Sequence, residues 1–132
     1  MKKLLLIFTL LFSVMFSSTS FAEWTKVAES AQGDANYVDF EIIREHDEYI
    51  YYWVLRDSIK PDKWGDFSAK TYYEGDCKLL RHKVLSDYFY PAPMAKGDPS
   101  TSSNIPDKEW RYLTPNSIGE TAIKAVCNFI NK

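Results

Sequence analysis

The sequence predicts an α+β fold in which several antiparallel strands precede one C-terminal helix that packs on one face of the sheet. Three observations support this prediction. Segments dense in aromatic and β-branched residues recur along the chain up to residue 113. Residues 117–131 repeat apolar side chains at helical spacing. Two cysteines are present, Cys77 in the strand region and Cys127 in the helix.

The N-terminal segment has the pattern of a secretory signal peptide. Two lysines precede the uncharged apolar run Leu4–Phe16, and Ser20 and Ala22 place small residues before a cleavage site. A membrane anchor is the alternative, but the run is shorter than the ~20 residues that a spanning helix needs. We therefore expect a signal peptide at 1–22, an exported domain at 23–132 and no membrane span in the mature chain.

The composition of the mature chain favours a sheet-rich fold and argues against nucleic acid as a partner. Loss of the two leader lysines from 16 basic residues leaves 14 against 18 acidic ones, which argues against a nucleic-acid partner. All nine Tyr and all four Trp remain, which favours strands. No cysteine stands at the end of the apolar run, where a lipid would be attached, so a lipid anchor is not predicted. The expected location is the periplasm, the cell surface or the medium.

The strands are expected in the following order. Residues 23–30 alternate, residues 36–45 form a second strand that breaks near Asp39, and residues 67–77 and 78–90 form a hairpin that turns near Gly75 to Lys78. A short last strand is expected at 108–113. The stretch "EYIYYWVLRDS" at 48–58 sends apolar side chains to both faces: Tyr49, Tyr51, Trp53 and Leu55 to one, and Ile50, Tyr52 and Val54 to the other.

The remaining segments are a long loop and the helix. Residues 91–107 hold four of the six prolines and have no periodicity, which indicates a long loop. Ser117 can cap a helix, and Glu120 completes a capping box. The expected apolar side of that helix carries Ile118, Ala122, Ala125, Val126 and Phe129.

The two cysteines predict one disulfide bond between Cys77 and Cys127, because export places them in an oxidising compartment. A redox-active pair is disfavoured because the CxxC spacing is absent. A zinc site is disfavoured because two cysteines without nearby histidines do not complete a zinc shell. The predicted disulfide tethers the helix to the sheet.

The charged residues suggest no catalytic or metal site, and we expect no enzyme, no cofactor and no metal. His46 lies beside Asp47 in a predicted turn, and His82 lies in a predicted strand. A histidine–carboxylate pair can perform acid–base chemistry, but a solvated turn explains this one as well. Three aspartates flank one loop without calcium-binding spacing, and we interpret them as solvated charge. They are Asp57, Asp62 and Asp66.

The surplus of aromatic residues is the strongest functional signal. Tyr and Trp are enriched at protein interfaces, although a core explanation for all of these residues is the alternative. The lone helix covers one face of the sheet, and the other face needs a cover from sheet curvature, a second subunit or an outside partner. The candidate binding or dimer surface comprises Tyr49, Tyr51, Tyr52, Trp53 and Tyr72.

Several short motifs, taken in the order in which they occur along the mature chain, resemble those of a known family. They are Trp24, "YVD" at 37–39, Trp53 with "VLRD", "DC" at 76–77, Arg81, Tyr88, Trp110, "PNSIGE" at 115–120 and "VC" at 126–127. With these motifs the chain resembles the surface-adhesin protein E family of Gram-negative bacteria. The resemblance implies a sheet of about six antiparallel strands with a disulfide-tethered helix on its concave side. It also implies dimerisation and, for the namesake adhesins, binding of vitronectin and laminin.

Three function hypotheses follow. The first is an exported, non-enzymatic binding protein that contacts a host extracellular or envelope macromolecule. The second is a periplasmic module that binds a small ligand such as a porphyrin on its aromatic surface. The third, an enzyme of unknown type, lacks a supporting motif.

Overall fold

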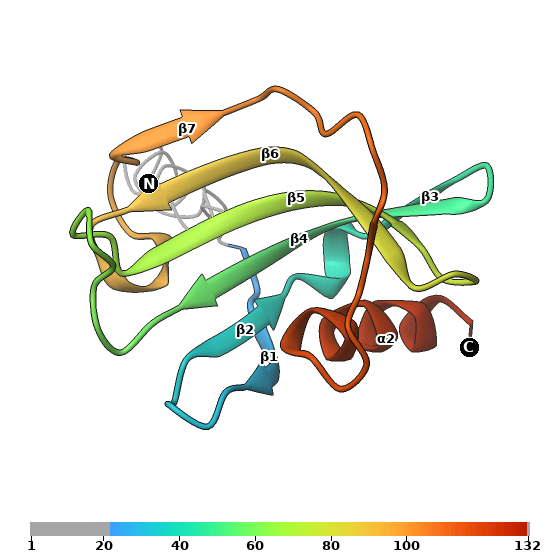
Figure 1. The fold of residues 1–132 in the computed structure, drawn as a ribbon, viewed down its shortest axis with the longest axis horizontal. Helices are drawn as coiled ribbons and strands as arrows, with labels where there is room; N and C mark the ends of the chain where they lie inside the picture. The colour runs from blue at the N-terminus through green and yellow to red at the C-terminus, as the bar shows by residue number, and fades with distance from the viewer. Residues whose placement is uncertain (1–21, 132) are drawn as a thin grey trace, which may run out of the picture.

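The structure is a computed structural model that describes residues 22–131, so the expected signal peptide lies outside the described residues, apart from Ala22. This part of the chain forms an eight-stranded antiparallel sheet and one α-helix (Figure 1). The elements are β1 Thr25–Glu29, β2 Ala35–Val38, η1 Phe40–Ile42, β3 Arg44–His46, β4 Tyr49–Asp57, β5 Ser68–Asp76, β6 Arg81–Tyr90, η2 Pro93–Ala95, β7 Thr101–Ser103, β8 Arg111–Tyr112 and α2 Ile118–Ile130.

The sheet has a main path of six strands in the order β1-β2-β4-β5-β6-β7. β3 pairs with β4. β8 pairs with the first residues of β6, and β7 pairs with its last residues. In Figure 1 the helix α2 lies near β1 and β2, and β7 lies at the opposite edge. The predicted fold class, an antiparallel sheet followed by a C-terminal helix, is confirmed.

β4 is the central strand, and its alternation divides the sheet into two faces as the sequence predicts. Ile50, Tyr52 and Val54 are buried and belong to the core beneath the helix. Tyr51 and Trp53 point to the other face and remain partly exposed. Because an antiparallel sheet places paired residues on the same face, this assignment extends to β5 and β6.

The helix begins where the sequence predicts. The Ser117 hydroxyl accepts a hydrogen bond of 3.1 Å from the backbone N–H of Glu120, and the Glu120 carboxylate accepts one of 3.0 Å from the N–H of Asn116. Two orphan N–H groups are thereby satisfied. The buried residues of the helix are Glu120, Ala122, Ile123, Val126 and Cys127.

The predicted apolar side of the helix is wrong at Phe129, which is 41 % exposed, and it omits Ile123, which is fully buried. The helix lies so close to β5 that Ile123 contacts Gly75. A Cβ atom on Gly75 would lie 2.9 Å from Tyr52 and 3.2 Å from Ile123. The side that packs is therefore centred on Ile123, and Phe129 contacts Phe40 at its margin, with 5.0 Å between ring centres.

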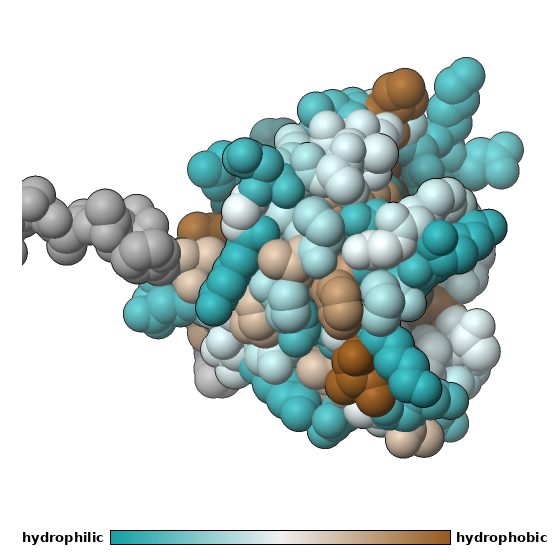
Figure 2. All heavy atoms as spheres, turned by 90° about the vertical axis from the view of Figure 1, so that its left-hand side faces the viewer, coloured by the Kyte–Doolittle hydropathy of each residue, from teal (hydrophilic) through white to brown (hydrophobic). Residues whose placement is uncertain are grey.

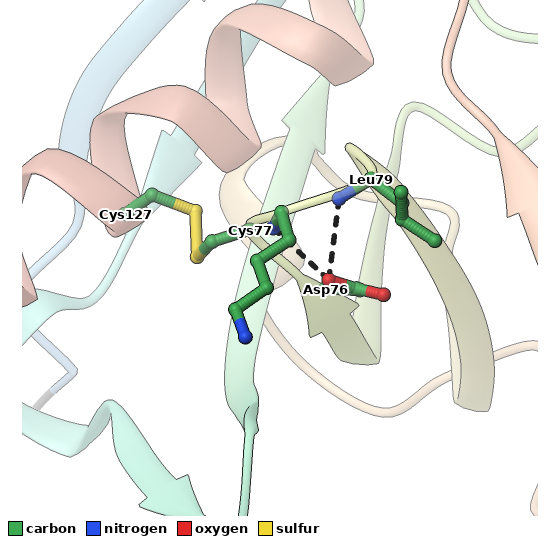
Figure 3. Close-up of a disulfide and its surroundings, with 5 residues drawn as sticks. Asp76, Cys77, Leu79 and Cys127 are labelled. Carbon is green, nitrogen blue, oxygen red and sulfur yellow. Dashed lines mark hydrogen bonds between the residues drawn. A yellow bond between two sulfur atoms is a disulfide. The ribbon is translucent and has the colours of Figure 1, made fainter.

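The predicted disulfide bond is present between Cys77 and Cys127, with Cα atoms 5.9 Å apart (Figure 3). It joins the last turn of α2 to the hairpin after β5. The turn itself is organised by Asp76, whose Oδ1 accepts hydrogen bonds from the N–H groups of Lys78 and Leu79 at 3.0 and 3.3 Å. The turn thus lies at residues 77–80, slightly later than predicted.

Two predicted segments are subdivided. The second strand ends at Val38, because the Asp39 carboxylate accepts a hydrogen bond from the Glu41 N–H and starts η1. The long loop at 91–107 contains η2 and β7, so it is more ordered than its composition suggests. The last strand is shorter than predicted and spans two residues.

Candidate functional site

The face of the sheet opposite the helix carries a continuous row of aromatic rings. Trp53 stacks on Tyr72 across the β4–β5 pair, with ring centres 4.9 Å apart. Tyr88 lies 6.0 Å from Trp53, and Tyr51 lies 6.3 Å from Tyr72. All four side chains are partly exposed. The Trp53–Tyr72 pair is stacked and the other two pairs are tilted, and both are arrangements that aromatic rings favour.

A second ring cluster extends this row toward the β3 end of β4. Trp110 precedes β8, and its ring centre lies 4.9 Å from that of Tyr49. The Arg81 guanidinium lies 4.4 Å and the Lys83 ammonium 4.8 Å from the Trp110 ring centre. The cations are within the range of cation–π attraction. The segment before α2 therefore closes one end of this face with a basic aromatic cluster.

A third group of rings surrounds Lys70 on β5. Its Nζ lies 5.7 Å from the ring centre of Trp53, 5.9 Å from Tyr88 and 5.5 Å from Tyr90. Among residues 22–131 neither Lys70 nor Lys83 has an ion-pair partner. Their charges are therefore available to an external anion.

We call this surface the aromatic face. Both of its ends are partly covered, because η2 contacts β4 and β5 at one end and Trp110 lies at the other. Its middle has no cover among the described residues. It comprises Tyr49, Tyr51, Trp53, Lys70, Tyr72, Arg81, Lys83, Tyr88 and Trp110.

The structure brings four of the five predicted surface residues together and separates the fifth. Tyr52 is 1 % exposed and lies on the helix side, where its ring stacks on Tyr73 with centres 5.5 Å apart. Tyr52 therefore belongs to the core and not to the aromatic face. Its separation follows from the alternation of β4, which the sequence already showed.

Sequence reasoning missed Trp110 and the two lysines as members of this surface. Lys70 and Tyr72 alternate on β5 as residues of one face, and this pattern could have revealed Lys70. Trp110 could not be found in this way, because its position depends on how residues 104–112 run along the edge of β6. The backbone N–H of Asp107 donates to the Val84 carbonyl at 2.8 Å and fixes that path.

Polar contacts on the aromatic face hold its rings in place. The Tyr51 hydroxyl donates a hydrogen bond of 2.9 Å to Glu74, and the Tyr88 hydroxyl lies 2.9 Å from the Asn104 side-chain oxygen. Burial, together with the hydrogen bond to Glu74, raises the pKa of Tyr51 to about 12. Tyr51 is therefore a neutral hydrogen-bond donor at physiological pH.

Asp76 and Arg81 form an ion pair at the base of the second ring cluster, with 2.9 Å between Nε and Oδ2. Burial opposes ionisation of Asp76, but the hydrogen bonds from Arg81 and from two backbone N–H groups outweigh it and lower the pKa of Asp76 below 3.8. Since this pKa is lower in the folded state than in the unfolded state, the pair stabilises the fold above pH 4. That contribution is lost as the pH falls through the folded-state value.

We therefore expect Asp76→Asn to lower the urea midpoint at pH 7 and to lower it less at pH 3, because the contribution of the pair declines once the pH falls below the ordinary pKa of a carboxyl group. Urea unfolding at the two pH values measures this difference. Asp98→Asn, an exposed carboxylate beyond η2, serves as the control and should change neither midpoint appreciably. An Asp76→Asn effect of equal size at both pH values would show that the charge is not what stabilises the turn.

The two histidines lie on opposite sides of the sheet, because His46 is paired with Tyr49 of the aromatic face. His82 stacks on Tyr73 on the helix side, with ring centres 4.3 Å apart, and burial lowers its pKa. His46 lies on exposed β3, and its Nε2 is 3.4 Å from the Asp47 carboxylate. His46 is thus the last residue of β3, and the predicted turn is formed by Asp47 and Glu48.

The loop end of the molecule offers a less coherent surface. Ile59 and Trp64, in the β4–β5 loop, are 61 % and 75 % exposed. In Figure 2, which views this end, hydrophobic atoms appear as small areas separated by hydrophilic ones.

The three aspartates that flank this loop accept hydrogen bonds within the fold. Asp57 accepts one from the Met94 N–H, Asp62 accepts from the N–H groups of Trp64 and Asp66, and Asp66 accepts one from the Ser100 hydroxyl.

No group of three or more His, Cys, Asp or Glu side chains is placed to hold a metal ion within residues 22–131. No helix in the same range is long and apolar enough to cross a membrane.

The comparison with protein families decides the family of the chain. The sequence profile of surface-adhesin protein E matches residues 24–128, which is most of the chain. The chain belongs to the surface-adhesin protein E family. No curated protein matches the chain.

Solved structures of protein E from Haemophilus influenzae share the fold. One, crystal form II, is 15 % identical with a TM-score of 0.64 and covers 86 % of this chain and 94 % of its own. Another, from a non-typeable strain, is 13 % identical with a TM-score of 0.51 and covers 85 % of this chain and 79 % of its own. At this level of identity the likeness shows the fold alone.

The adhesin E motifs occupy two kinds of position in the structure. Asp39, Asp76 and Ser117 accept hydrogen bonds that set turns or helix starts. Trp53 and Trp110 lie on the aromatic face, as does Tyr88. The motifs that carry the family resemblance thus include both the fold-defining turns and part of the candidate surface.

Proposed function

We propose that this protein is an exported, non-enzymatic binding protein that contacts a macromolecule of the host extracellular matrix or of the bacterial envelope through its aromatic face. The observation that carries the proposal is the uncovered middle of that face, where Trp53, Tyr72 and Tyr88 adjoin the unpaired cation Lys70. Membership of the adhesin E family supports the general function. The signal-peptide pattern supports export.

The chemistry of the aromatic face suits a macromolecular interface. Trp, Tyr and Arg contribute most of the binding energy in typical interfaces, because large rigid rings lose little conformational entropy on binding. Here the rings are fixed by mutual stacking and by hydrogen bonds such as that of Tyr51 to Glu74. A preorganised surface of this kind reduces the entropic cost of association.

The test is a pull-down with the mature protein against host matrix and envelope proteins, followed by affinity measurement on the retained partner. Trp53→Ala is expected to weaken binding by about thirtyfold, the effect of one interface hot spot of ~2 kcal/mol. Trp64→Ala removes an equally large ring from the exposed β4–β5 loop and should leave the affinity unchanged. Circular dichroism of both variants confirms that they fold.

Two results would contradict the proposal. One is retention of no matrix or envelope macromolecule, and the other is equal loss of affinity in Trp53→Ala and Trp64→Ala. Cell fractionation adds an independent check, because an adhesin must be exposed at the surface or released. A strictly periplasmic protein would leave only an envelope partner.

Two alternative occupants of the aromatic face, a second copy of the chain and a porphyrin, can be tested with the wild-type protein and the Trp53→Ala variant. A second copy of the chain would appear as a dimer in size-exclusion chromatography, and the dimer of Trp53→Ala would dissociate more readily. A porphyrin would change the tryptophan fluorescence of the wild type more than that of Trp53→Ala.

A further inference from the structure

An open hollow of about 690 Å³ lies at the η2 end of the aromatic face. Trp24 supplies a ring, and two lysines, Lys70 and Lys96, supply positive charge. Among residues 22–131, no acidic residue lines it. The lining comprises Trp24, Lys70, Met94, Ala95, Lys96 and Gly97, together with Ala22, which the expected cleavage removes from the mature protein.

Lys70 connects this hollow with the aromatic face. Its side chain lines the hollow, and its Nζ lies 5.7 Å from the Trp53 ring centre on the neighbouring strand. Lys96 is exposed. Neither lysine forms an ion pair with any residue between 22 and 131. The hollow therefore combines a ring surface with two uncompensated positive charges.

The wall of the hollow is held in one conformation. Met94 and Ala95 adopt left-handed backbone angles, with φ of 57° and 53°, which non-glycine residues rarely do. Hydrogen bonds of 2.8 Å fix both residues, from the Met94 N–H to Asp57 and from the Ala95 N–H to the Ser68 hydroxyl. Strain that is maintained in this way is typical of preorganised binding surfaces.

Two carboxylates also lie on this side of the sheet: Asp76 pairs with Arg81, and Glu74 accepts a hydrogen bond from Tyr51. A second cationic position is Lys83 on β6, whose Nζ lies over the Trp110 ring. Lys83 is paired with Glu74 on β5, and Glu74 is four residues from Lys70 along that strand. Four residues of a strand span ~13 Å. Ring surfaces lie between the two cationic positions. This order suits an extended ligand that alternates flat apolar surfaces with anionic groups.

We propose that the hollow and the adjoining aromatic face bind an anionic polysaccharide that carries sulfate or carboxylate groups on its sugars. The C–H faces of the sugar rings stack on Trp24 and Trp53, and the anionic groups pair with Lys70 and Lys96. An extended acidic peptide fits less well, because the backbone of β5 is already paired on both sides and offers no edge for strand addition. The inference rests on the proposed function and names the class of its partner.

The test measures binding of the mature protein to heparin, with dextran as the uncharged polysaccharide. Wild type should bind heparin and not dextran, and its affinity should fall as salt is added, because salt screens exposed charges. Lys70→Gln with Lys96→Gln is expected to weaken binding by about tenfold or more, since each lysine loses a charge-assisted contact. Lys78→Gln with Lys108→Gln removes the same charge from two exposed positions outside the hollow and should retain wild-type affinity.

The inference is overturned if wild type does not bind heparin, if Lys70→Gln with Lys96→Gln binds like wild type, or if the control pair loses as much affinity. Binding of purified lipopolysaccharide but not of heparin also overturns it, because the charge would then come from lipid-linked phosphate. A matrix protein retained through Trp53 without heparin binding leaves the proposed function intact. Loss of both kinds of binding contradicts both proposals.

Discussion

Replacing Cys77 and Cys127 with serine is expected to lower the free energy of unfolding by about 4 kcal/mol. The bond closes a chain of 50 residues, and cross-linking a loop of that length removes a large amount of conformational freedom from the unfolded chain. A domain of this size has a total stability of only ~5–15 kcal/mol. The double variant should therefore unfold at a much lower urea concentration than wild type, as monitored by tryptophan fluorescence.

Reduction of the wild-type protein provides the control for this prediction. Protein in dithiothreitol should match the double variant, because both lack the cross-link and differ only in two small side chains. Intact mass before reduction shows whether the two thiols are oxidised after export. An unchanged urea midpoint in the double variant would mean that core packing alone holds α2 against the sheet.

The second large effect is expected at Tyr52. Its side chain is 1 % exposed and lies among Val54, Ile123 and Tyr73 in the core. Tyr52→Ala should lower the free energy of unfolding by about 3–5 kcal/mol, because removal of a buried ring leaves a cavity that the neighbouring side chains fill only in part. Urea unfolding measures the loss.

Tyr51→Ala is the matched comparison, since Tyr51 is the adjacent tyrosine on the opposite face. It loses a partly exposed ring and one hydrogen bond to Glu74, so its cost in stability should be clearly smaller. The functional effects should follow the reverse order, because Tyr51 is on the aromatic face and Tyr52 is beneath it. Equal destabilisation by the two variants would show that the two faces of β4 are covered to the same extent.

The main features of the fold could be predicted from local patterns. The alternation in "EYIYYWVLRDS" assigned each side chain of β4 to the correct face. Ser117 and Glu120 identified the start of α2 through a capping box that the structure confirms. The disulfide followed from an even number of cysteines in an exported chain. In each case a few neighbouring residues carried the whole signal.

Features set by distant contacts could not be predicted in this way. The buried side of α2 is determined by the close approach of Ile123 to Gly75 on β5. The helical repeat alone does not fix how the helix is rotated about its axis, and the predicted side therefore omitted Ile123. η2 forms within the proline-rich segment because Asp57 and Ser68, far away in sequence, accept and donate its hydrogen bonds. Composition contains no information about such partners.

The candidate site shows the same division. Four of its aromatic residues were predicted, because they alternate on two neighbouring strands. Trp110 joins Tyr49 only through the path of residues 104–112 along the edge of β6. Lys70 could have been predicted from its alternation with Tyr72 on β5, whereas Lys83 reaches the ring of Trp110, which is brought there by the same path of residues 104–112.

The second apolar face of β4 is thus partly covered from within the chain. η2 covers one end and Trp110 the other, and the stacked rings in the middle remain partly exposed. This arrangement explains how a small domain with one helix keeps an aromatic surface available. It also places the exposed rings between two sets of cations.

Hydroxyl-radical footprinting of the protein in complex with its recovered partner locates the contact without any substitution. The binding surface proposed here predicts that oxidation of Trp53, Tyr72 and Tyr88 falls in the complex, while Trp64 and Phe129, exposed elsewhere on the molecule, react as in the free protein. Protection confined to Trp64 or Phe129, with Trp53, Tyr72 and Tyr88 unchanged, would contradict the assignment of function to the aromatic face.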